Sequence, residues 1–307
     1  MLTIVWGDMA QARQILQSSL DQWVRLPIGA RVAMLVVTAA GALSAMHAIV
    51  RYLSPSIHPF ELAFFRSLFG FIVIVPLLLR SGIESLRTHQ PRLQMLRGLI
   101  SISAMLSWFY GLSMVPLAEA TALSFTNAIF GSIAAMIFLR ERMTTARGMA
   151  IVFGLVGVLV ILRPGFGDFD IGLLWVLFSA MCWGCSVVIV KQLGRTDSAV
   201  SIVAWVGIQL SILSLPFALT VWIWPTVQEW LWLLSLGTLA TLGHLCMIQG
   251  LKLADAMTIF PLDFTRLIWA SLLGFFIFSE SLDLWTVVGA GIIVVSGTCM
   301  LYREDRS

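Results

Sequence analysis

Charged side chains are scarce in this chain. Of its 307 residues only 11% are Asp, Glu, Lys or Arg, while 59% are hydrophobic and the mean hydropathy is +0.94. A soluble domain carries about a quarter charged residues, so an ordinary soluble protein is excluded. Most of the chain is therefore predicted to lie in a lipid bilayer. The formal net charge of +3 is small, and nucleic acid is not an expected partner.

Further absences exclude whole classes of function. The sequence has no phosphate-cradling Gly-rich loop ending in Lys, which excludes a nucleotide-driven pump. Cys182 and Cys185 have the spacing of a zinc or redox motif but lack a second ligand pair, so the four cysteines are interpreted as core residues that hold no metal or cofactor. His47 and His244 fall in different apolar stretches, without acidic neighbours at helical spacing. An enzyme is therefore not expected.

Ten apolar stretches are long enough, at roughly 20 residues each, to cross a hydrocarbon core of about 30 Å. Short turn signals such as Ser54-Pro55 and Val115-Pro116 separate them. Residues 1–30 contain too many charges for a signal peptide, and they form a predicted cytoplasmic segment, either an interfacial amphipathic helix over 9–25 or an unstructured tail. The ten stretches are 31–53, 59–79, 93–113, 117–139, 146–163, 171–192, 198–223, 229–252, 254–278 and 284–302.

The chain contains an internal repeat. Residues 111–141 align without a gap to residues 250–280 at a constant offset of 139, with eight identities in 31 positions. Five apolar stretches precede the break near 164–170 and five follow it, so two units are predicted, 31–164 and 170–302. An odd number of helices per unit makes the second unit insert upside-down relative to the first. The predicted fold is therefore all-α, with ten transmembrane helices in two inverted repeats, which is typical of secondary transporters.

The distribution of basic residues predicts the orientation of the chain. With a cytoplasmic N-terminus, 15 Lys or Arg residues fall on the inner side and only Arg51 and Arg163 on the outer side. The remaining two, Arg66 and Arg266, fall inside apolar stretches. Both termini are therefore expected in the cytoplasm.

Several short motifs fit this ten-helix plan. Phe60–Arg66 opens the second stretch, Leu96–Leu99 and Ser107–Leu112 lie in the third, and Glu141 and Glu280 close the fourth and ninth. With these motifs the chain resembles the EamA-type drug/metabolite transporters, most closely the branch of bacterial S-adenosylmethionine uptake carriers, whose relatives handle riboflavin. The resemblance implies ten helices and alternating access without ATP hydrolysis. The carrier is expected in the bacterial inner membrane, as a monomer or homodimer. The resemblance leaves the cargo, the direction and the coupling ion open.

Arg66 is a charge at membrane depth. An ionisable side chain there costs at least about 2.5–3.5 kcal/mol, so it needs a partner or a polar cavity. One interpretation is a contact with an anionic group of the substrate. The other is a structural role, in which backbone carbonyls or the nearby Glu61 satisfy the guanidinium.

Asp263 and Arg266 are spaced i, i+3 and therefore share one face of the ninth helix. The repeat offset pairs them with Ser124 and Asn127 in the fourth stretch. Four polar positions related in this way predict a central binding site, while mutual neutralisation of the two charges is the simpler alternative. Asp263 is also a candidate carrier of a coupling proton. Pro261 is expected to open the helix and free carbonyl groups.

Aromatic side chains favour a planar organic cargo. Trp108, Tyr110 and Trp183 are the main candidates for stacking against it, and Trp205 and Trp269 are weaker ones. The alternative for each is a place in the aromatic belt at the membrane interface.

Together these features predict a secondary transporter of a small organic metabolite, with S-adenosylmethionine or a riboflavin-like compound as the candidate for uptake. A proton-coupled exporter of amino acids or toxic amphiphiles is the alternative. Glycines in the fifth and tenth stretches are expected to make scaffold or dimer contacts. The predicted substrate site consists of Arg66, Trp108, Tyr110, Ser124, Asn127, Trp183, Asp263 and Arg266.

Overall fold

The computed structural model of the chain describes seven segments. Within them the regular structure is entirely α-helical and contains no strand. Three predictions concern residues outside them: the amphipathic helix over 9–25, the place of Glu141 at the end of the fourth stretch and the opening of the helix at Pro261. The described segments are residues 26–81, 87–139, 145–162, 170–197, 199–253, 262–281 and 283–304.

Within the described residues, helices occupy all ten apolar stretches. By length and composition, five helical segments can cross a membrane, and four shorter helical segments are also apolar. The prediction of an all-helical protein with membrane-spanning helices is therefore confirmed. The helices are α2 (Ile28–Leu53), α3 (Pro59–Ser81), α4 (Pro91–Leu112), α5 (Leu117–Ser124), α6 (Asn127–Leu139), α7 (Thr145–Leu162), α8 (Ile171–Leu193), α9 (Ala199–Leu219), α10 (Val227–Leu253), α12 (Thr265–Phe278) and α13 (Leu284–Glu304).

Proline and aspartate fix where several helices begin. Pro59 and Pro91 are the first residues of α3 and α4. A backbone N–H at this position makes no hydrogen bond within the helix, so proline, which has none, is tolerated there. Asp170 caps α8, because its carboxylate accepts a hydrogen bond of 2.7 Å from the backbone nitrogen of Gly172.

The fourth stretch, predicted as one helix over 117–139, is interrupted between α5 and α6. The Ser124 hydroxyl donates to the Thr121 carbonyl at 2.7 Å, and the Thr126 hydroxyl donates to the Leu123 carbonyl at 2.6 Å. The backbone nitrogen of Thr126 also bonds three residues back, to Leu123 at 3.0 Å. These i to i−3 bonds replace the α-helical pattern locally. The interruption leaves polar groups in the middle of an apolar segment.

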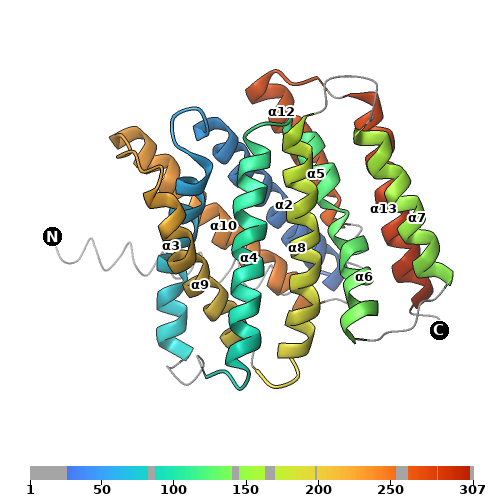
Figure 1. The fold of residues 1–307 in the computed structure, drawn as a ribbon, viewed down its shortest axis with the longest axis horizontal. Helices are drawn as coiled ribbons and strands as arrows, with labels where there is room; N and C mark the ends of the chain where they lie inside the picture. The colour runs from blue at the N-terminus through green and yellow to red at the C-terminus, as the bar shows by residue number, and fades with distance from the viewer. Residues whose placement is uncertain are drawn as a thin grey trace.

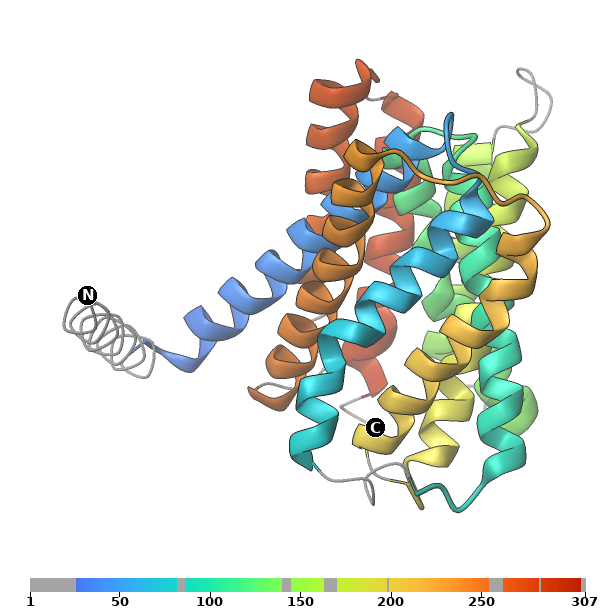
Figure 2. The same ribbon diagram turned by 90° about the vertical axis from the view of Figure 1, so that its left-hand side faces the viewer.

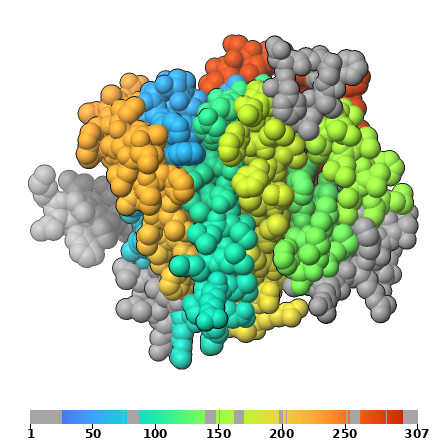
Figure 3. Space-filling model, viewed as in Figure 1, coloured from blue at the N-terminus to red at the C-terminus, as the bar shows by residue number. Residues whose placement is uncertain are grey.

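The helices pack as a bundle, with α7 and α13 side by side at one edge and α3 and α9 at the other (Figure 1). Between these edges α4 packs against α8, and α10 packs against α2, which crosses the bundle obliquely (Figure 2). Helices α9, α4, α8, α6 and α7 all contribute to one face of the molecule (Figure 3). A Cβ atom on Gly157 of α7 would lie 2.8 Å from the carbonyl oxygen of Gly289 of α13, so these two glycine-containing helices make a close scaffold contact.

Two further close contacts are related by the repeat offset. A Cβ atom on Gly98 of α4 would lie 2.5 Å from the Gln209 side chain of α9. A Cβ atom on Gly237 of α10 would lie 2.9 Å from the backbone nitrogen of Gly70 of α3. Residue 98 corresponds to 237 and residue 70 to 209 at the offset of 139. The contact between α4 and α9 and the contact between α10 and α3 therefore use equivalent positions of the repeat.

Phe125 and Phe264, which are also equivalent at this offset, contact each other. Their ring centroids are 4.9 Å apart, with an interplanar angle of 83°. The interruption beside Phe125 is repeated beside Phe264, since the Thr265 hydroxyl donates to the Leu262 carbonyl at 2.7 Å. Two equivalent positions of the sequence repeat are therefore in direct contact with each other.

Asp197, between α8 and α9, joins two loops outside the apolar segments. Its buried carboxylate accepts hydrogen bonds from the Thr88 hydroxyl and from the backbone nitrogen of His89, the latter at 2.9 Å. Burial alone would raise the pKa of Asp197, but these hydrogen bonds outweigh it and hold the pKa below its ordinary value. The ionised carboxylate is therefore the form that stabilises this end of the bundle.

We expect Asp197→Asn to lower the melting temperature of the purified protein, through a loss of about 1 kcal/mol. Because the pKa of Asp197 is lower in the folded protein than in the unfolded chain, its contribution is complete above about pH 4. That contribution is lost as the pH falls through the folded pKa. Thermal unfolding from pH 7 to pH 3 measures both effects. An equal loss in Arg195→Gln, a substitution of an exposed neighbour, would contradict the assignment.

Candidate functional site

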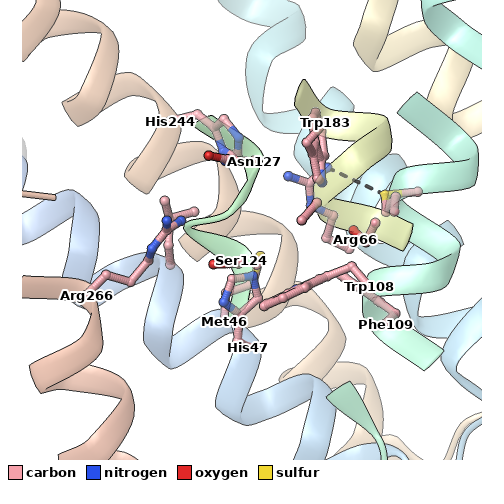
Figure 4. A pocket seen from close by; sticks show the side chains of 14 residues that line it. Met46, His47, Arg66, Trp108, Phe109, Ser124, Asn127, Trp183, His244 and Arg266 are labelled. Atoms are coloured by element: carbon pink, nitrogen blue, oxygen red, sulfur yellow. Dashed lines mark hydrogen bonds between the residues drawn. The ribbon is translucent and has the colours of Figure 1, made fainter. Parts of the chain in front are cut away.

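A cavity of about 220 Å³ lies between the central helices (Figure 4). Residues of α2, α3, α4, α5, α6, α8, α10 and α12 line it, so both halves of the chain contribute. Its lining combines two arginines and two histidines with tryptophan, methionine and serine side chains. The lining residues are Leu43, Met46, His47, Arg66, Met105, Trp108, Phe109, Ser124, Asn127, Ser179, Ala180, Trp183, His244 and Arg266.

Six of the eight predicted site residues lie at this cavity. They come from six different helices, and two of them flank the interruption between α5 and α6. Asp263 is not a lining residue, but its carboxylate Oδ2 lies 3.3 Å from Nη2 of Arg266. Tyr110 is not a lining residue either, and its ring packs edge-on against Trp175 at 5.5 Å. The six are Arg66, Trp108, Ser124, Asn127, Trp183 and Arg266.

Arg266 is held by protein groups on several sides. Besides Asp263, the Phe125 ring lies 5.2 Å from its guanidinium carbon. The Ser44 hydroxyl donates to the backbone carbonyl of Arg266 at 3.2 Å. The charge of Arg266 is therefore balanced and its position is fixed from α2 and α5.

Arg66 has a different environment. The Sδ atom of Met105, 3.9 Å from Nη1, is its only hydrogen-bond partner among the described residues. Glu61, one of the partners considered from the sequence, is fully buried and accepts instead from the backbone nitrogen of Ile223 at 3.1 Å. Arg66 and Arg266 lie on opposite sides of the cavity in Figure 4, with Ser124 between them.

Trp108 presents both an aromatic surface and an unused donor. Its ring packs against His47, with centroids 5.0 Å apart at 63°. The indole Nε1 is buried and has no partner among the described residues. Trp183 also lines the cavity and lies beside Arg66 in Figure 4. Trp205 and Trp269, the weaker stacking candidates, are not lining residues.

Sequence reasoning did not select His47, His244 or Met105. A lone buried histidine is usually a packing residue, so neither histidine was among the expected site residues. The repeat offset could have found part of this set, since it pairs Met105 with His244 as it pairs Asn127 with Arg266. Nδ1 of His244 donates to the Ala240 carbonyl at 2.7 Å, which leaves Nε2 as the free ring nitrogen. Within the described residues no three His, Cys, Asp or Glu side chains gather as they would around a metal ion.

At one end of the bundle, Glu280 connects three helices. Its Oε1 atom lies 2.6 Å from Nη2 of Arg51 at the end of α2, and its Oε2 atom accepts from the backbone nitrogen of Leu117 at the start of α5. Ser279, with φ of 56°, ends α12 in the left-handed region and turns the chain back. A Cβ atom on Gly274 would lie 2.8 Å from Glu280 Oε2, so this glycine leaves room for the carboxylate. Glu280 thus caps the start of α5 and is the ion-pair partner of Arg51.

The EamA-like transporter family matches the chain twice, over residues 30–163 and over residues 170–302. The chain belongs to this family. It is therefore a multi-pass membrane transporter of small molecules rather than an enzyme, as the sequence predicted.

Several relatives that are named for a transported compound align with most of the chain. An S-adenosylmethionine uptake transporter of Rickettsia bellii is 31% identical over 86% of this chain and 91% of the relative. A riboflavin transporter of Vibrio cholerae is 29% identical over 89% and 94%, and a pseudopaline exporter of Pseudomonas aeruginosa is 27% identical over 86% and 93%. A solved crystal structure, 19% identical, superposes with a TM-score of 0.62 over 90% of this chain and 99% of its own. That last likeness concerns the fold alone.

Proposed function

We propose that the protein is a secondary transporter that carries a small organic metabolite by alternating access, with the 220 Å³ cavity as its substrate site. The observation that carries this proposal is the composition of the cavity. The cavity lies between apolar helices and gathers cationic, aromatic and hydroxyl side chains from both halves of the chain. Each of these halves matches the transporter family. Such a site at the interface of two repeats is where secondary carriers bind their cargo.

For this alternating-access transport cycle we propose an architecture of ten helices in two inverted five-helix units, with both termini in the cytoplasm. The double family match supports two units, 31–164 and 170–302. The contact between Phe125 and Phe264 supports an axis that passes between them. The excess of basic residues on one side supports the orientation. Rocking one unit against the other about this axis would expose the cavity to each side in turn.

S-adenosylmethionine is the first candidate cargo, because four uptake transporters of that name are 31–32% identical to this chain. Trp108 and Trp183 supply faces on which an adenine ring stacks. Riboflavin, the cargo named for relatives at 27–29% identity, has a planar ring as well. The predicted substrate contacts of Arg66, Ser124, Asn127 and Arg266 are part of this proposal.

Uptake of labelled compounds tests the proposal. Bacterial cells that express the protein are compared with empty-vector cells, using S-adenosylmethionine, riboflavin and the aromatic amino acids. We expect uptake of at least one compound, and a severalfold lower rate in Asp263→Asn, because Arg266 then loses its counter-charge. The matched control is Asp170→Asn, which keeps a good helix cap outside the cavity and should transport normally. Expression without gain or loss of any compound would contradict a transport function.

Export is the second direction to be tested, because one relative is named an exporter. A proton-coupled exporter of amino acids or toxic amphiphiles would accumulate the compound in inverted vesicles when a proton gradient is applied. Asp263 is the candidate for the coupling proton in that case. The same panel, run in inverted vesicles with and without the gradient, separates the two directions.

A further inference from the structure

We propose that the cavity recognises its cargo through a carboxylate group, which binds the guanidinium of Arg66. This inference deepens the proposed transport function and rests on it. Arg66 lines the cavity, yet Met105 Sδ at 3.9 Å is its only hydrogen-bond partner in the part of the chain that the structure describes. A thioether is a weak acceptor, and a cation at membrane depth is costly without a counter-charge. An anionic group of the cargo supplies what the protein does not.

Two carboxylates that could have paired with Arg66 are engaged with other groups. Glu61, on the same helix as Arg66, accepts from the backbone nitrogen of Ile223 at 3.1 Å. Oδ2 of Asp263 lies 3.3 Å from Nη2 of Arg266, and Arg266 is on the opposite side of the cavity from Arg66 (Figure 4). The two arginines therefore have distinct roles. Arg266 is a positioned part of the wall, and Arg66 is the cation left for the ligand.

The charge balance favours a carboxylate over a phosphate. Two arginines and one carboxylate leave a single positive charge at the site, counting both histidines as neutral. A carboxylate brings one negative charge and two coplanar oxygens that match the guanidinium fork. A phosphate monoester carries about 1.5 to 2 negative charges at neutral pH and would leave the buried site with excess negative charge.

The neighbouring groups indicate what the carboxylate is attached to. The unpartnered indole N–H of Trp108 is a second donor at the same cavity. The rings of Trp108 and Trp183 and the thioethers of Met46 and Met105 suit a planar or sulfur-containing body. The ligand class is therefore a carboxylic acid with an aromatic or thioether-like body. Among the panel compounds, S-adenosylmethionine and the aromatic amino acids belong to it, and riboflavin does not.

Probe pairs that differ only in the carboxylate test the inference. S-adenosylmethionine is compared with its carboxamide, and L-tryptophan with L-tryptophanamide, by calorimetry on the full-length protein in nanodiscs. We expect the wild type to bind the acid of at least one pair roughly 10- to 150-fold more tightly than the amide, the range for a lost charge-assisted hydrogen bond. Arg66→Gln should abolish this preference. Arg66→Lys should keep part of it, because the charge remains but the two-pronged geometry is lost.

A second readout separates recognition from folding. Arg66→Gln should not lower the melting temperature of the ligand-free protein, because its charge has no protein partner. The matched control is Arg97→Gln, which removes a buried guanidinium that donates to the Ile202 carbonyl at 2.6 Å. This control should lower the melting temperature and leave the preference for the acid intact.

The outcomes are distinct. Equal affinity for acid and amide, binding of neither member of either pair, or a preference that survives in Arg66→Gln would each overturn the inference. Transport of riboflavin alone would also overturn it, while the transport function would stand. Binding of the acid that depends on Arg66, without transport of any panel compound, would support the inference and contradict the transport function.

Discussion

Gly184→Leu is expected to reduce transport to the background level. A Cβ atom at this position would lie 2.5 Å from the backbone nitrogen of Gly131 and 2.7 Å from the backbone carbonyl oxygen of Asn127. Backbone atoms cannot move aside as a flexible side chain can, so α6 and α8 must separate. Overpacking of this kind costs about 1–3 kcal/mol or more. The separation also displaces Asn127 and Trp183, which line the cavity on these two helices.

Initial uptake rates in proteoliposomes, normalised to the amount of inserted protein, measure this effect. Gly184→Ala should show an intermediate loss, because it adds only the Cβ atom. The matched control is Gly291→Leu on α13, where no atom lies within 4 Å of the added Cβ. It should transport at nearly the wild-type rate. Equal rates for Gly184→Leu and Gly291→Leu would show that the close approach of α6 and α8 is not required.

Glu280→Ala is expected to slow transport at least about tenfold, which corresponds to 1.4 kcal/mol. The substitution leaves the Arg51 guanidinium without its carboxylate partner and the backbone nitrogen of Leu117 without an acceptor. Hydrogen bonds to charged groups contribute about 1.5–3 kcal/mol each when buried, and the partial exposure of this pair reduces that figure. The contacts join α2, α5 and the end of α12, so their loss should open this end of the bundle.

Two measurements check this prediction. Uptake gives the rate, and labelling of a cysteine placed at Ser124, in a background without native cysteines, reports access from the Arg51 side. Glu280→Ala should speed labelling by a reagent that does not cross membranes. The matched control is Glu229→Gln. The Glu229 carboxylate accepts hydrogen bonds from the backbone nitrogen and the hydroxyl of Thr226, in the turn that begins α10. Unchanged labelling in Glu280→Ala would mean that another contact holds this end closed.

Hydropathy was sufficient to find the helices, because each membrane crossing needs about 20 apolar residues whatever the fold. It could not find the interruption between α5 and α6. That feature depends on the hydroxyls of Ser124 and Thr126, which bond to carbonyls three residues back without altering the apolar pattern. The sequence repeat brought Ser124 and Asn127 to attention for another reason, their equivalence to Asp263 and Arg266.

The candidate site was only partly accessible from the sequence. Trp108 and Tyr110 were chosen together, although residues two apart on a helix point to different faces. The structure accordingly places Trp108 at the cavity and packs Tyr110 against Trp175. The distinction between a paired Arg266 and an unpaired Arg66 depends on where Glu61 is engaged. Its acceptor role toward Ile223, far away in the sequence, is set by the packing of α3 against the loop after α9.

The unpaired guanidinium of Arg66 also makes the carrier sensitive to voltage. In the proposed cycle the unloaded cavity holds one uncompensated positive charge, that of Arg66, as it switches sides. A transmembrane potential acts on charge at about 2.3 kcal/mol per elementary charge per 100 mV for a full crossing. An interior-negative membrane therefore pulls the unloaded cavity toward its inward-facing form, which hinders the return step of an importer and assists that of an exporter.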